Sequence, residues 1–175
     1  MRRIQIALRR LYGLACWNVH RGHGTFLTFE FGRPHVFVRE PYKSISKSKR
    51  VRQFAASRFT YVHGDWHVWI YCCDWAVFEG PRLIGNSGSN RRMDRAARFL
   101  NGQKLVKAWI APPGMRSYFE FDLGGRLETR PYDRVSEQWL LYEPNGNVLT
   151  VRADKRYSYG SGDREPDRQR WLAIK

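Results

Sequence analysis

Acidic side chains are scarce in this chain of 175 residues. Aspartate and glutamate number 16 against 31 lysine and arginine, which gives a net charge of +15. An excess of this size favours polyanionic partners, such as nucleic acid, or an acidic protein. An arginine-rich composition inherited from the genome is the alternative explanation, and both stay open at this stage.

Cysteines and long apolar runs are also scarce. The three cysteines are an odd number, and neighbouring Cys72 and Cys73 point to opposite faces of a strand, so no disulfide framework is expected. This usage is typical of a reducing compartment, and we expect a cytoplasmic protein. No run approaches the roughly 18 apolar residues of a membrane helix. Arg9 and Arg10 interrupt the apolar start, so no export signal is expected.

Recognisable catalytic motifs are missing as well. The sequence contains neither a phosphate-cradling glycine motif nor paired Cys-x-x-Cys, and we expect no cofactor, no metal and no catalytic residue. His63 and His67 would lie about 13 Å apart in a straight strand, too far to share a metal unless the chain turns at Gly64. Glu30 alternates with two phenylalanines, which predicts an exposed carboxylate.

The chain does contain many hydrophobic residues and one repeated sequence motif, which we call the repeated phrase. Hydrophobic residues make up 42% and aromatics 15%, enough to bury the core of one compact domain over residues 1–175. The phrase FEFGRPHVFVREPY (Phe29–Tyr42) returns as FEFDLGGRLETRPY (Phe119–Tyr132). Each copy reads as an aromatic strand, a turn at Gly32 or at Gly124-Gly125, a second strand and then a tryptophan strand.

These patterns predict an α+β fold that is mostly β. Two similar antiparallel meanders, within residues 25–80 and 115–160, would pack as a sandwich or a partly open barrel. A helix over residues 89–101 connects them, with Met93, Ala96, Ala97 and Leu100 on one face, a cap at Ser89 or Asn90 and an end at Asn101-Gly102. A polar tail, 160–175, ends in an apolar tetrapeptide that either docks on the core or frays.

The positive charge is concentrated outside the expected strands. A basic insertion, 43–62, separates the first Pro-Tyr from its tryptophan strand, and the helix carries four arginines. With the four arginines of the first ten residues, these segments hold 13 of the 15 net charges. The predicted binding residues are Lys43, Lys47, Lys49, Arg50, Arg52 and Arg58 in the insertion and Arg91, Arg92, Arg95 and Arg98 on the helix.

Three functions fit this sequence. The first is a non-enzymatic protein that contacts nucleic-acid phosphates, of DNA or RNA, through the insertion and the helix. The alternative is an accessory or immunity-type subunit that docks an acidic protein partner through the same surface or through exposed aromatics. The third is a hydrolase that uses the histidines and aspartates between residues 63 and 74. The oligomeric state is not predicted.

Overall fold

The computed structural model describes residues 1–111, 113–165 and 168–175. Within them the chain forms three α-helices and fourteen strands. The elements are α1 (Arg2–Arg9), β1 (Cys16–Arg21), β2 (Leu27–Phe31), β3 (His35–Arg39), α2 (Lys49–Ala55), β4 (Phe59–His63), β5 (Trp66–Ile70), β6 (Asp74–Glu79), β7 (Arg82–Asn86), α3 (Asn90–Leu100), β8 (Leu105–Ala111), β9 (Arg116–Phe121), β10 (Gly125–Arg130), β11 (Glu137–Tyr142), β12 (Asn147–Arg152), β13 (Arg156–Ser161) and β14 (Trp171–Ala173).

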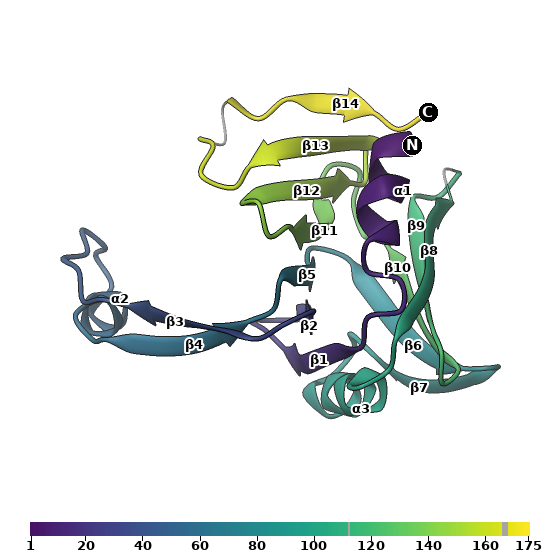
Figure 1. Ribbon diagram of the computed structural model, residues 1–175, viewed down its shortest axis with the longest axis horizontal. Helices are drawn as coiled ribbons and strands as arrows, with labels where there is room; N and C mark the ends of the chain where they lie inside the picture. The colour runs from purple at the N-terminus through teal and green to yellow at the C-terminus, as the bar shows by residue number, and fades with distance from the viewer. Residues whose placement is uncertain (112, 166–167) are drawn as a thin grey trace.

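Two antiparallel sheets make the body of the molecule (Figure 1). The larger has the strand order β1-β2-β5-β11-β12-β13-β14, and the smaller has the order β7-β6-β10-β9-β8. The predicted α+β, mostly β class is confirmed, and the sheets are not closed into a barrel. No helix among the described residues combines the length and the apolarity needed to cross a membrane.

Aromatic side chains join the two sheets. The ring of Phe29 on β2 stacks against Phe121 on β9 with 6.4 Å between centroids, and Trp139 on β11 meets Phe119 on β9 edge to face at 5.9 Å. The buried Trp139 indole also donates a hydrogen bond to the Ser117 hydroxyl at 2.9 Å. A single core therefore lies between the sheets, as expected for two layers that each bury one face.

Helix α3 confirms the helix predicted for residues 89–101. The Ser89 hydroxyl accepts a hydrogen bond from the backbone N–H of Arg92 and caps the first turn. The four predicted apolar residues are buried, and the helix packs against β7 and β1. Helix α1 was not predicted; it buries Ile4, Ala7 and Leu8 and contacts β8.

The end of the chain docks on the body. Strand β14 pairs with β13, and Ile174 is buried with its backbone N–H bonded to the Lys155 carbonyl at 2.8 Å. The apolar tetrapeptide of the tail thus completes one edge of the larger sheet.

Strands β3 and β4 leave the body as a separate two-stranded ribbon. They pair with each other in a sheet of their own, and α2 lies at the far end (Figure 1). We call residues 33–65 the arm. It contributes no side chain to the main hydrophobic core of the described chain. The basic insertion expected at 43–62 is the outer part of this arm and includes α2 and most of β4.

The two copies of the repeated phrase pair differently. In the second copy, β9 and β10 form the expected hairpin. In the first copy the expected hairpin is wrong, because β2 has β1 on one edge and β5 on the other, and β3 pairs with β4 instead. With both edges of β2 occupied, the chain after Gly32 has no free edge to return to.

Candidate functional site

The ten predicted cations fall into two separate places. All ten are exposed. Six lie at the outer end of the arm, whereas the four arginines of α3 lie on the body, next to β1 and β7 (Figure 1). Arg58 pairs with Glu40 at 2.9 Å, and the other five arm cations form no ion pair within the described residues. The structure therefore does not bring the insertion and the helix together on one surface.

One face of the arm is a continuous row of rings. The register pairs His35 with His63, Phe37 with Tyr61 and Arg39 with Phe59, so these side chains share a face. We call Phe37, Phe54, Phe59, Tyr61 and His63 the aromatic face. Its neighbouring ring centroids lie 4.6–5.9 Å apart.

Two features stabilise the outer end of this row. The Arg39 guanidinium lies 4.2 Å from the centre of the Phe54 ring and donates to the Phe54 carbonyl at 2.6 Å, which ties α2 to β3. The rings are nevertheless accessible, with Phe37, Phe54 and Phe59 exposed by 47%, 52% and 44%. Exposed aromatics in such a row are available to stack on planar ligands.

The opposite face of the arm is aliphatic. Val36, Val38 and Val62 point to this side and are exposed by 68%, 52% and 40%. We call these three residues the valine face. A contiguous exposed apolar face of this kind marks an interaction site more often than an isolated apolar side chain does.

The arm joins the body through two close-packed glycines. Gly32 has a φ of +79°, and a Cβ there would lie 2.4 Å from a carboxylate oxygen of Asp65. A Cβ on Gly64 would lie 2.3 Å from the Phe31 carbonyl oxygen. The chain bends between β4 and β5, and the backbones approach so closely there that only glycine fits at these positions. The bend brings the His63 ring within 5.7 Å of the His67 ring, measured between centroids.

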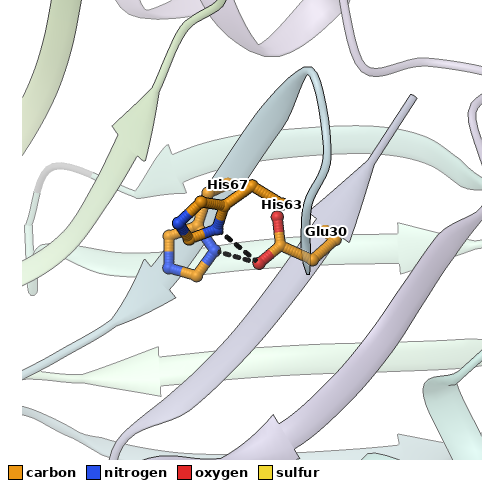
Figure 2. A group of neighbouring side chains, drawn as sticks. All are labelled: Glu30, His63 and His67. Atoms are coloured by element: carbon orange, nitrogen blue, oxygen red, sulfur yellow. Dashed lines mark hydrogen bonds and ion pairs between the residues drawn. The ribbon is translucent and has the colours of Figure 1, made fainter. Parts of the chain in front are cut away.

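Glu30 lies beside this pair of histidines. It pairs with His67 across β2 and β5, and its carboxylate accepts hydrogen bonds from His67 Nδ1 at 2.7 Å and His63 Nδ1 at 3.4 Å, both through Oε1 (Figure 2). The other oxygen accepts the Gly64 N–H at 2.8 Å. The expected exposure of Glu30 is wrong: only 2% of it is exposed, because the bend at Gly64 folds the chain over it.

The charge state of Glu30 follows from these contacts. Burial raises the pKa of the Glu30 carboxyl, but the hydrogen bonds and charge of His67, with the Gly64 N–H and His63, outweigh it and leave the pKa below its ordinary value. Figure 2 shows both imidazole rings with one nitrogen toward the carboxylate and the other directed away from it. We call Glu30, His63 and His67 the histidine cluster.

A second carboxylate fixes the start of the arm. Asp65 accepts hydrogen bonds from the Arg33 backbone N–H at 2.7 Å and from His35 Nε2 at 2.8 Å. These two hydrogen bonds lower the pKa of the Asp65 carboxyl below its ordinary value. Asp65 thus links β3 to the β4–β5 bend and stabilises the orientation of the arm.

A cavity of about 610 Å³ lies where the arm meets the body. His35, Phe37 and His63 line it from the arm, and the residues that line it from the bend and the body are Gly64, Asp65, His67, Trp69, Tyr142, Glu143, Pro144 and Gly146. The aromatic face therefore leads directly into a cavity that is lined by the two histidines of the histidine cluster. This volume is in the range of small-ligand sites.

The chain gives no match to a protein-family model, to a curated protein or to a solved structure.

Proposed function

We propose that this protein binds single-stranded nucleic acid along the arm. Bases would stack on the aromatic face while the cations at the outer end contact phosphates. The observation that carries the proposal is the row of exposed rings beside five cations that have no carboxylate partner among the described residues. Stacking surfaces flanked by positive charge are the common plan of proteins that bind single strands without reading sequence.

The energies expected for such a surface are large enough to measure. A base stacked on an aromatic side chain contributes about 1–3 kcal/mol, and each phosphate contact to a single strand adds about 0.7 to the slope of log affinity against log salt. Three exposed rings and several cations would therefore give an affinity that depends on both aromatic area and ionic strength. Stacking on any base implies little sequence preference.

The arginines of α3 are not needed for this interface. They lie on the body, away from the arm (Figure 1). We therefore assign Lys43, Lys47, Lys49, Arg50, Arg52 and Arg58 to the proposed interface and leave Arg91, Arg92, Arg95 and Arg98 outside it. This division supplies a matched control, because both sets are exposed and strongly basic.

The test is fluorescence anisotropy with a labelled oligothymidine at several salt concentrations. Phe59→Ala should weaken binding about 5- to 150-fold, the equivalent of one stacked base. Replacing Lys47, Lys49, Arg50 and Arg52 by alanine should lower the salt slope by about 0.7 for each phosphate that is no longer contacted.

Two variants serve as controls. Leu123→Ala removes an exposed side chain of the second copy, and the fourfold alanine variant of α3 removes an equal charge from the body. Both should bind as the original protein does. Absence of binding near 100 mM salt (a typical condition for non-specific contacts), or equal weakening in the arm and α3 variants, would overturn the proposal.

The valine face favours a second candidate, an acidic protein partner. Val36 and Val62 offer exposed apolar area on the side of the arm opposite the rings, and the cations at the outer end would meet the acidic groups of the partner. A pull-down in which Val36→Ser and Val62→Ser release an acidic protein that Phe59→Ala retains would support this candidate. Release by the Phe59→Ala variant alone would argue against it.

A further inference from the structure

We propose that the histidine cluster is a binding site for a divalent transition metal, with Zn²⁺ as the best chemical fit. Two imidazole nitrogens and one carboxylate oxygen form a donor set that zinc accepts readily, and zinc sites with three protein ligands keep a position for an exchangeable ligand. The sequence spacing argues against a metal because His63 and His67 lie four residues apart. The bend at Gly64 removes that objection.

The donor atoms are already close to the required arrangement. One ligand atom from each of the three residues lies within 4.8 Å of the others. Zinc bonds of about 2.0–2.1 Å in a tetrahedron place neighbouring ligand atoms about 3.3 Å apart. Glu30 Oε1 lies 3.4 Å from His63 Nδ1 and 2.7 Å from His67 Nδ1. His67 Nδ1 would move about 0.6 Å away from Oε1 to reach this spacing, and the two histidine nitrogens, which lie within 4.8 Å of each other, would adjust to the same spacing.

The surroundings hold the carboxylate in place for a metal. Glu30 Oε2 accepts the Gly64 N–H at 2.8 Å, which leaves Oε1 directed at the two histidines (Figure 2). Gly64 is itself held against the backbone of Phe31. Hydrogen bonds that orient a ligating carboxylate in this way are a regular part of metal sites and raise their affinity.

The charge of the cluster also favours a cation. Glu30 is 2% exposed, and no lysine or arginine forms an ion pair with it among the described residues. A buried carboxylate is costly unless a positive charge compensates it. The histidines compensate it only when protonated. A divalent metal would supply a permanent countercharge.

The cavity offers room for the remaining coordination position. His63 and His67 both line it, and Tyr142 and Trp69 form the wall nearby. A fourth ligand, water or an oxygen of a bound molecule, would be exchangeable from this side. Such an open position distinguishes a site that acts on ligands from a purely structural one, whose four ligands all come from the protein.

The test is titration of the metal-stripped full chain with Zn²⁺ by calorimetry and with Co²⁺ by visible absorption. We expect one Zn²⁺ per chain with a dissociation constant of about 10 μM or tighter. The Co²⁺ complex should show the intense absorption of a tetrahedral or five-coordinate ion. Glu30→Gln and His63→Ala should each weaken Zn²⁺ binding at least about 100-fold.

Two controls make the assignment specific. Glu120→Gln changes the same position of the second copy, and His23→Ala removes an exposed histidine that belongs neither to the cavity lining nor to the cluster. Both should keep the original affinity. His63 has a side chain 39% exposed, so His63→Ala is informative even where Glu30→Gln does not fold. No saturable binding below about 100 μM Zn²⁺, or equal weakening by His23→Ala, would overturn the site. Neither the calorimetric nor the absorption measurement uses nucleic acid, so failure of the metal site is distinguishable from failure of the proposed function.

Discussion

Phe29–Tyr42 and Phe119–Tyr132 begin alike in the sequence and end in different structures. Their first strands face each other across the core, where Phe29 stacks on Phe121. Their second halves then diverge. Leu127 in the second copy is 1% exposed, while Phe37, at the same position of the first copy, is 47% exposed on the arm. The first half of the phrase builds the body in both copies, and the second half builds either body or arm.

The difference comes from the neighbouring strands. In the second copy β10 lies between β9 and β6 in the smaller sheet, and Leu127 belongs to the core between the two sheets. In the first copy β3 has only β4 beside it. The glutamates show the same effect: Glu120 lies opposite Arg126 and Lys107, whereas Glu30 lies opposite His67. The second copy thus contributes to the packing of the body, whereas the similar first copy contributes to the candidate binding site.

The largest difference in stability is expected when the ninth residue of each copy is replaced. Leu127→Ala should cost about 3 kcal/mol of unfolding free energy, because it opens a cavity between the sheets. Phe37→Ala should cost less than about 1 kcal/mol, because half of the ring is already in water. Urea unfolding of both variants measures the difference. Equal costs would mean that the arm is part of the cooperative core.

The next test replaces a turn glycine in each copy. Gly32 and Gly124 have φ values of +79° and +87°, so alanine is strained at both, by about 1 kcal/mol. A Cβ at Gly124 meets nothing within 4 Å, whereas one at Gly32 collides with Asp65. We expect Gly32→Ala to lose about 1–2 kcal/mol more, since it also disturbs the hydrogen bonds of Asp65. Thermal unfolding of both variants at one pH checks this; a Gly124→Ala destabilisation as large as that of Gly32→Ala would contradict the proposed packing.

The smallest expected effect is on the pH dependence of the free energy of unfolding. The lowered pKa of Glu30 means that its contribution to stability is complete above the ordinary glutamate value of 4.5 and is lost as pH falls through the folded pKa. Glu30→Gln should therefore flatten the decline of unfolding free energy between about pH 5 and pH 3. Chemical unfolding at closely spaced pH values compares this variant with the original protein, and an unchanged slope in Glu30→Gln would contradict the assigned contacts.

Much of the fold could be predicted where short-range patterns decide it. The spacing of Met93, Ala96, Ala97 and Leu100 specifies α3, and the glycine turn after Phe121 specifies the β9–β10 hairpin. The same spacing occurs in Ile4, Ala7 and Leu8 of α1 and in Leu11 just after it, and all four residues are buried. The arginines that flank these residues are compatible with the exposed side of a helix. The signal for this helix was therefore present.

The candidate site could be predicted only in part. The cations of the arm follow from composition, but the pairing of Glu30 with His67 joins residues far apart in the chain, and no local pattern encodes it. The bend at Gly64 depends on the backbone of Phe31 beside it. A turn at Gly64 is the condition under which the sequence lets the two histidines meet, and the dipeptide Gly64-Asp65 is itself a turn signal.

One consequence follows from where the arm begins. His63 is the last residue of β4 and belongs to the arm, whereas Glu30 and His67 belong to strands of the body. The histidine cluster thus joins the base of the arm to the body, at the end of the arm opposite α2 (Figure 1). Any change in the direction of the arm would therefore alter the separation of His63 from Glu30.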